Sequence, residues 1–63
     1  MNVAIKTDGR LLKIGNVSHW NIIDGDLNIV RMGVVNGKET GAIVASFRSW
    51  EYVTEDESDE MDD

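Results

Sequence analysis

The sequence predicts an all-β fold: an antiparallel meander of five or six short strands that curls into a small barrel or a two-layer sandwich, followed by a disordered acidic C-terminal tail. Three observations lead to this prediction. Glycine-containing turn dipeptides divide the chain into short segments. Within those segments apolar residues recur at the period of two that is typical of strands. Seven of the twelve carboxylates lie in the last nine residues, as expected of a solvated, unfolded segment.

Four turn dipeptides separate the predicted strands. Asp8-Gly9, Asp24-Gly25 and Asn36-Gly37 suit type I′ turns, because both central residues of that turn take positive φ angles. Gly15-Asn16 suits a type II′ turn, which favours glycine at its first central position. Each dipeptide therefore predicts a β-hairpin, and we expect strands over the following ranges: 3–7, 10–14, 17–23, 26–35, 40–47 and 50–53.

Apolar residues occur on both faces of the predicted strands. Leu27 and Ile29, for example, share one face of the fourth strand. The opposite faces are also partly apolar, at Ala4, Leu11, Val30, Val34, Val44 and Val53. A single flat sheet cannot bury both sets. Either the sheet bends over on itself, with Gly33 and Gly41 as bulge or bend positions, or a second copy of the chain covers the second face.

The chain is long enough for one domain, which we place at residues 1–53, with the acidic tail at residues 54–63. A body of this size is near the lower limit for unaided folding, because it buries only about 60% of its unfolded surface. The sequence contains no cysteine, so neither disulfides nor a thiolate-bound zinc ion can stabilise it. Self-association is the remaining common solution, and we expect a homo-oligomer.

The charge is divided between two unlike segments. Residues 1–54 hold six cations and five acids, a balance of 6 − 5 = +1, whereas residues 55–63 carry −7. Such an acidic segment either keeps a small apolar protein soluble or binds a basic protein partner through contacts that salt weakens. The tail residues that would make these contacts are Glu55, Asp56, Glu57, Asp59 and Glu60.

No targeting or membrane segment is visible in the sequence. The first twenty residues contain Lys6, Asp8, Arg10 and Lys13 and lack the apolar run of a signal peptide. No stretch approaches the length of about 20 apolar residues that a transmembrane helix needs. We therefore expect a cytoplasmic protein without a membrane partner.

No residue pattern indicates catalysis or a bound cofactor. The segment Asp24-Gly25-Asp26-Leu27-Asn28 matches the first ligands of a calcium-binding loop, but Ile29 replaces the required glycine and Val35 the bidentate glutamate. His19 is the only histidine, and no nucleophile lies at a recognised spacing from it. No nucleotide-binding glycine motif occurs. We expect no enzymatic activity, no metal and no cofactor.

Aromatic residues and a neighbouring arginine form a second candidate surface. Trp20, Phe47, Trp50 and Tyr52 would suit stacking on the bases of a single-stranded nucleic acid, and Arg48 lies next to Phe47 in the sequence. The net charge of −6 opposes phosphate binding, so we do not expect a nucleic-acid partner. Most of these rings are better explained as core side chains, and any that stay exposed are candidates for contact with a protein.

Four short segments are spread along the body: Thr7-Asp8-Gly9-Arg10, Trp20-x-Ile22, Asp24-Gly25-x-Leu27-x-Ile29 and Ala45-x-Phe47-x-x-Trp50-x-x-Val53. Together they resemble short uncharacterised proteins encoded by bacteriophages and prophages, notably those of actinobacteria. The resemblance implies a single small β domain with an acidic end. It also implies an accessory gene product made in a bacterial cytosol, and it carries over no catalytic residue.

The predicted function is non-enzymatic protein binding by a small phage-type accessory protein, directed at a host factor or a defence system. An exposed strand edge, the aromatic patch or the acidic tail would make the contact. Two alternatives stay open. In one, an oligomer sequesters a small anionic ligand between its copies, with Arg10, Arg31 and Arg48 as cations. In the other, the sheet serves only in the assembly of a virion.

Overall fold

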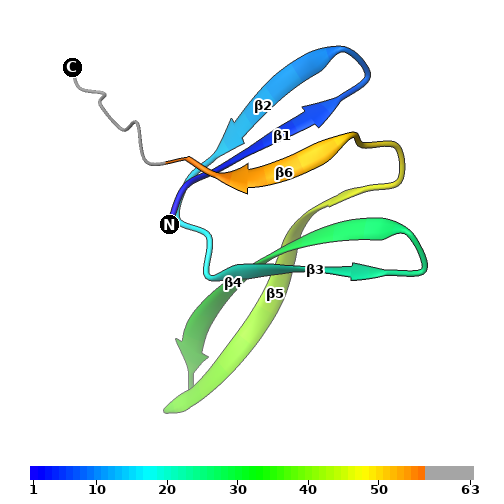
Figure 1. Ribbon diagram of the computed structural model, residues 1–63. Helices are drawn as coiled ribbons and strands as arrows, with labels where there is room; N and C mark the ends of the chain where they lie inside the picture. Colours follow the sequence, from blue (N-terminus) through cyan, green and yellow to red (C-terminus); the bar gives the residue numbers. More distant parts are fainter. Residues whose placement is uncertain (57–63) are drawn as a thin grey trace, which may run out of the picture.

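Residues 1–56 are described by the structure, a computed structural model, and they form six antiparallel strands (Figure 1). The strands are β1 (Val3–Thr7), β2 (Arg10–Ile14), β3 (His19–Ile23), β4 (Asp26–Val35), β5 (Lys38–Phe47) and β6 (Tyr52–Glu55). They make two sheets of three strands, in the orders β2-β1-β6 and β3-β4-β5. The all-β, two-layer prediction is therefore confirmed. Over these residues the chain has no long apolar helix, and hence no helical membrane span.

Three of the four predicted turns form as the sequence indicates. The central residues of the β1–β2 turn, Asp8 and Gly9, have φ angles of 51° and 75°. The β3–β4 and β4–β5 turns repeat this geometry, with both central residues at positive φ. This is the type I′ pattern, whose twist matches that of the flanking strands. These turns fix the register of the three hairpins.

The hairpin predicted at Gly15-Asn16 is wrong. Only Asn16 takes a positive φ, at 61°, and the chain crosses there from β2 in one sheet to β3 in the other. Arg31 holds this crossover, because its Nε donates to the carbonyl of Asn16 at 2.8 Å and its Nη2 to that of Gly15 at 3.0 Å. The local dipeptide was typical of a turn, but a side chain distant in sequence determines the path.

The second crossover, residues 48–51, carries the chain back from β5 to β6, which pairs with β1. The hydroxyl of Thr7 donates to the carbonyl of Ser49, and the Glu51 amide donates to the carbonyl of Lys6 at 2.7 Å. β6 runs to Glu55, two residues beyond the boundary expected at residue 53, and the Asp56 amide then donates to the Asn2 carbonyl at 2.7 Å. Residues 54–56 were predicted to begin the disordered tail, but they pair with or bond to the start of the chain. The rest of the predicted tail, residues 57–63, lies outside the described residues.

The core lies between the two sheets. Four side chains are fully buried, Val3 and Ile5 from β1 and Leu27 and Ile29 from β4, and Val17 in the first crossover joins them. Burying each such side chain stabilises the fold by about 1.5–3 kcal/mol. Larger, partly buried side chains surround this centre: Ile14, Trp20, Ala45, Phe47, Trp50 and Val53.

The long β4–β5 hairpin contains one irregularity, and its place differs from the prediction. Ile29 pairs with Ala45 but Val30 pairs with Ile43, so Val44 is an extra residue in β5. Gly33 and Gly41, the expected bulge or bend positions, both pair in regular register. A bulge bends and twists the strand that contains it. Beyond Val44 the hairpin therefore leaves the body at an altered angle.

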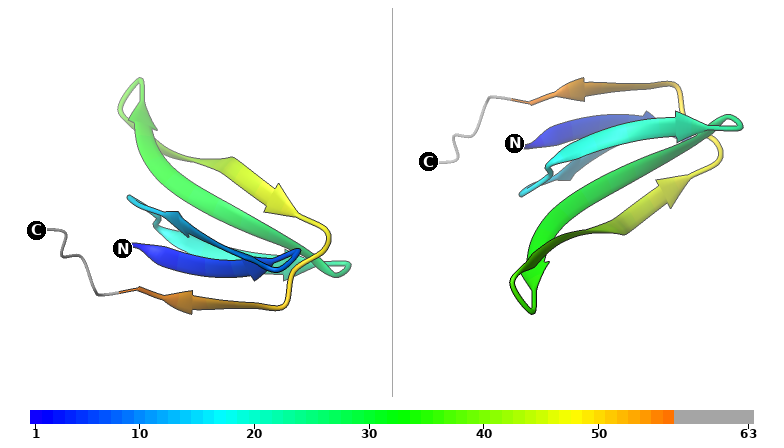
Figure 2. Two further views of the ribbon diagram at one scale, coloured as in Figure 1. Left: turned by 90° about the horizontal axis from the view of Figure 1, so that it is seen from above. Right: turned by 90° about the horizontal axis from the view of Figure 1, so that it is seen from below.

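We call residues 31–44 the arm. β3 pairs with β4 only as far as Val30, so along the rest of β4 the only strand partner within residues 1–56 is β5. Both views in Figure 2 show the far ends of β4 and β5, with their turn, extending away from the other strands. None of the five core residues lies in the arm.

Candidate binding surface

The arm concentrates exposed apolar side chains. Ten large hydrophobic residues of the described chain are exposed, and five of them lie in the arm: Met32 (40%), Val34 (70%), Val35 (57%), Ile43 (61%) and Val44 (41%). Single exposed apolar residues are normal on soluble proteins, but a cluster on one element marks an interaction surface. The arm is the best candidate for such a surface.

Strand pairing separates the arm into two faces. Val35 lies opposite Lys38, and Arg31 opposite Ala42. Arg31 and Val35 are each an even number of residues from Ile29, so their side chains lie on the same side of β4 as that of Ile29, which points into the core. The core-facing side of the sheet therefore continues into the arm, where β1, β2 and β6 contribute nothing to its lining.

A shallow groove runs along this continued face. It has a volume of about 260 Å³ and is lined by Arg31, Met32, Gly33, Val35, Thr40, Ala42 and Val44. The guanidinium of Arg31 is engaged with the carbonyls of Gly15 and Asn16, so the lining is largely apolar. Such a groove suits the apolar side chains of a protein better than a charged small molecule.

The outer edge of β5 is a second feature of the arm. The carbonyl of Val35 and the amide of Lys38 flank the turn and are hydrogen-bonded to each other in a type I′ hairpin. Hydrogen-bonded and non-hydrogen-bonded pairs then alternate along the ladder. The backbone groups of Glu39, Gly41 and Ile43 therefore point away from β4, toward a side on which the described chain places no strand.

The other three edge strands are better protected. β2 and β3 have five residues and β6 has four, whereas β5 has ten. β2 also carries Arg10 and Lys13, and short or charged edges resist pairing with another chain. On β5 the charges, Lys38 and Glu39, both lie beside the turn, and the stretch from Gly41 to Ala45 has none.

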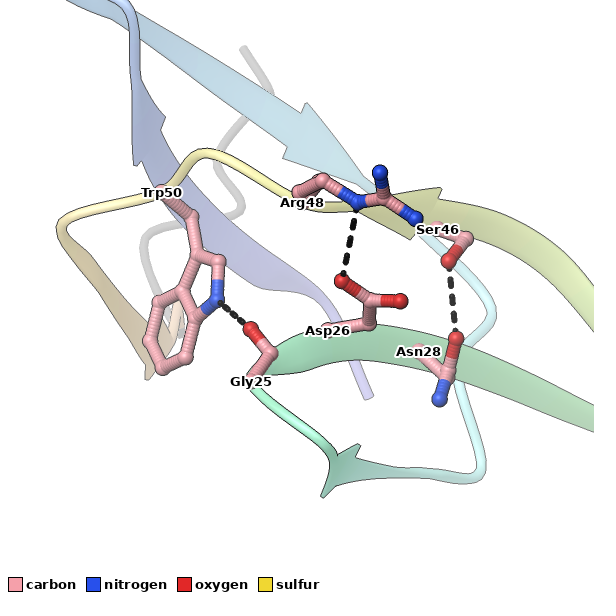
Figure 3. Close-up of polar contacts among 6 residues, drawn as sticks. All are labelled: Gly25, Asp26, Asn28, Ser46, Arg48 and Trp50. Carbon is pink, nitrogen blue, oxygen red and sulfur yellow. Dashed lines mark hydrogen bonds and ion pairs between the residues drawn. The ribbon is translucent and has the colours of Figure 1, made fainter.

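The aromatic residues predicted to form a patch do not share one surface. Trp20 and Trp50 pack against the core, and the Trp50 Nε1–H donates to the Gly25 carbonyl at 3.0 Å (Figure 3). Tyr52 pairs with Lys6, while its neighbour Val53 pairs with the buried Ile5. Tyr52 therefore lies on the outer face of its sheet, where it is 48% exposed.

Arg48, another predicted interaction residue, lies on the outer face of the second sheet. Its Nε is 3.5 Å from Oδ1 of Asp26 (Figure 3). The Arg48 side chain is 90% exposed, so this ion pair contributes little to stability. Beside it, the Ser46 hydroxyl donates to Oδ1 of Asn28 at 2.8 Å, and Nδ2 of Asn28 donates to Oδ1 of Asn21 at 3.1 Å.

The predicted acidic contact residues are only partly covered by the structure. Glu55 is exposed at the end of β6. Asp56 forms an ion pair with Lys13, with 3.6 Å between Oδ2 and Nζ. Glu57, Asp59 and Glu60 lie outside the described residues.

The structure does not gather the cations that would bind an anion within one chain. Arg10 begins β2 at the first turn, Arg31 is bonded to the β2–β3 crossover, and Arg48 faces Asp26. No group of three or more potential metal ligands occurs in the part of the chain that the structure describes. His19 is exposed on β3, opposite Val30.

Sequence reasoning did not identify the arm, although one signal pointed to it. Val34 and Val44 were recognised as apolar residues on the second face of their strands, together with Val30, which is buried in the structure at 7% exposure. The pattern showed that this face needs a cover but not that the chain itself leaves it uncovered.

A comparison of the chain with protein-family models, curated proteins and solved structures finds no match.

Proposed function

We propose that this chain is a small non-enzymatic protein of phage type that acts by binding another protein through the arm. The observation that carries the proposal is the groove, an apolar continuation of the core-facing sheet side that β1, β2 and β6 do not line. An extended segment of a partner that lays apolar side chains on Val35, Ala42 and Val44 would replace the missing layer.

Charge defines a further property of the partner. The carboxylates of residues 55–63 favour a basic protein, and such contacts are sensitive to salt because exposed charges more than about 10 Å apart are screened at 0.1 M. The groove contact is apolar and should resist salt. Binding therefore has two components that salt separates.

The proposal includes self-association and a cytoplasmic location in a bacterial host. A body this small gains from burying its exposed apolar residues against a second copy. The resemblance to short proteins of bacteriophages supports the bacterial cytosol as the compartment and a host factor or defence protein as the target.

Two matched variants test the proposal. Val35 and Ile23 are both 57% exposed, but only Val35 lines the groove. The tagged wild-type chain, Val35→Gln and Ile23→Gln are used to capture protein from bacterial lysate, and the captured protein is purified and titrated against each. We expect Val35→Gln to weaken binding at least about tenfold, the effect of losing one well-packed apolar contact, and Ile23→Gln to leave it unchanged.

Equal losses with both variants, or none with either, would refute the groove as the binding site. A chain that lacks residues 57–63, and therefore keeps β6 (Tyr52–Glu55) whole, is titrated in parallel at low and high salt. The tail contribution is confirmed if deletion removes only the salt-sensitive part of the binding free energy.

A further inference from the structure

We propose that the arm also joins two copies of this chain, through antiparallel pairing of β5 with β5 of a second copy around a two-fold axis at Gly41. The inference rests on the proposed function and assigns different parts of the arm to different partners. The edge of β5 binds the second copy, and the groove on the broad face binds the target protein. The β3-β4-β5 sheets of the two copies would thereby join through β5 into one continuous sheet.

The hydrogen-bonding pattern determines the register. Glu39, Gly41 and Ile43 direct their backbone groups outward, and the extra residue Val44 interrupts the ladder next to them. An antiparallel pair centred on Gly41 places Glu39 opposite the second copy's Ile43 and Gly41 opposite its equivalent. Each of the three outward residues then meets an outward residue. A shift toward the turn or toward Val44 loses at least one of these pairs.

Side-chain packing is compatible with this register. A Cβ atom at Gly41 would lie 3.1 Å from Sδ of Met32 and 3.4 Å from Cγ1 of Val30. Met32 therefore already leans over Gly41 and toward the edge of the sheet. In the dimer the two methionine side chains would approach each other across the paired glycines, and the exposed Ile43 would lie in the neighbouring row.

Two properties of this edge suit pairing with a second copy in this register. The outward residues are arranged symmetrically about Gly41, so one strand is complementary to itself when it is turned around. The same register also keeps the two Glu39 carboxylates apart, because each faces an isoleucine. Centring the pair on Glu39 instead would place like charges directly opposite each other, which is unfavourable.

Charge substitutions at position 43 test the register. Ile43 is 61% exposed and lies about 13 Å along the strand from Glu39 of its own chain, so within one copy either charge should be tolerated. In the proposed dimer, Ile43→Glu faces the second copy's Glu39 and Ile43→Lys forms an ion pair with it. Sedimentation equilibrium is measured at about 100 μM, a concentration high enough to populate a dimer held by a small and weak interface.

We expect the wild-type chain and Ile43→Lys to have twice the chain mass of 7.0 kDa. Ile43→Glu should raise the dimer dissociation constant at least about tenfold, because it juxtaposes like charges. The double variant Glu39→Lys with Ile43→Glu should restore dimerisation. A monomeric wild-type chain, or equal effects of Ile43→Glu and Ile43→Lys, would overturn the proposal. Circular dichroism confirms that each variant is folded.

Disulfide trapping gives a second readout that does not depend on charge. In the proposed register Thr40 lies opposite the second copy's Ala42, a pair whose Cα atoms should be about 4.5 Å apart and within disulfide reach. The chain has no other cysteine. Mixing Thr40→Cys with Ala42→Cys should give a disulfide-linked dimer, whereas Thr40→Cys alone should not. The reverse result would contradict the register.

The dimer and the proposed function can fail separately. If the chain is monomeric but Val35→Gln still weakens target binding, the dimer proposal is refuted and the groove stands as the binding site. If Ile43→Glu dissociates the dimer but neither Val35→Gln nor Ile23→Gln weakens target binding, the dimer proposal stands and the groove is refuted as the binding site.

Discussion

Trp50 is the residue that joins the second crossover to the β3–β4 turn. Its ring packs against the core and its Nε1–H bonds to the carbonyl of Gly25. Trp50→Phe retains most of the apolar contact but removes the donor. We expect a loss of about 0.5–1 kcal/mol in the free energy of unfolding, the low end for a hydrogen bond because the site is partly exposed.

Urea denaturation of the two proteins measures this loss. Trp20→Phe is the control, because Trp20 also packs against the core but has no hydrogen bond from its indole in the described structure. A loss in Trp20→Phe as large as that in Trp50→Phe would mean that ring size, and not the hydrogen bond, explains the effect.

At the level of single residues, the sequence predicted which side chains are buried better than it predicted which groups they contact. The apolar residues of alternate parity, such as Ile5, Leu27 and Ile29, are buried as expected. The partners of Trp50 and Arg31 were not predictable, because each bonds to backbone carbonyls at least 15 residues away in the chain. Only the three-dimensional path of the chain brings these groups together.

The hairpins depend on turn residues that can adopt positive φ. Gly25 has a φ of +83°, and no atom lies within 4 Å of a Cβ built on it. Gly25→Ala therefore introduces backbone strain without a steric clash, and we expect a loss of about 1 kcal/mol. Gly33 is the matched control, since its Cβ position is equally open but its φ is not positive.

Thermal unfolding experiments measure the melting temperatures of both variants. A loss of this size should lower the melting temperature by about 4–8 °C for a domain near this length, whereas Gly33→Ala should change it little or raise it. Equal decreases in both variants would show that the added methyl group itself, and not the turn conformation, is responsible.

At the level of elements, local signals sufficed for neighbouring strands but not for distant ones. Asp8-Gly9, Asp24-Gly25 and Asn36-Gly37 predicted three hairpins that the structure contains. Gly15-Asn16 carried a similar signal but lies at a crossover. No local pattern distinguishes the two cases, because the pairing of β6 with β1 and the bonds from Arg31 are long-range interactions.

In the whole molecule, the arm and the core are separate. Replacing residues 32–41 by Asn-Gly would join Arg31 and Ala42, which are paired in the present hairpin, through a new type I′ turn. We expect the shortened chain to fold with a melting temperature within a few degrees of the wild type, because the buried cluster contains no arm residue. It should lose both self-association and target binding.

Calorimetry and sedimentation of the shortened chain check this prediction. If the chain fails to fold, the arm stabilises the body and cannot be regarded as an independent binding element. If it folds and still binds the captured target, the binding site lies in the body or the tail.

The overall architecture was predictable from the sequence because its main determinants are local: turn chemistry, strand periodicity and apolar content. The candidate site was not, because exposure is a property of the assembled chain. Val34 and Val35 have the residue type of core positions, yet they are 70% and 57% exposed. The alternation of residues specifies which side chains share a face, but not whether another layer covers that face.

The separation of arm and core also affects how this protein can evolve. Most substitutions are removed by selection because they destabilise the fold. Substitutions at Val34, Val35 or Ile43 would alter the proposed recognition surface, and these residues contribute nothing to the buried cluster. A new target can therefore be acquired by drift along one hairpin without compensating changes elsewhere, which would suit a protein whose target changes from host to host.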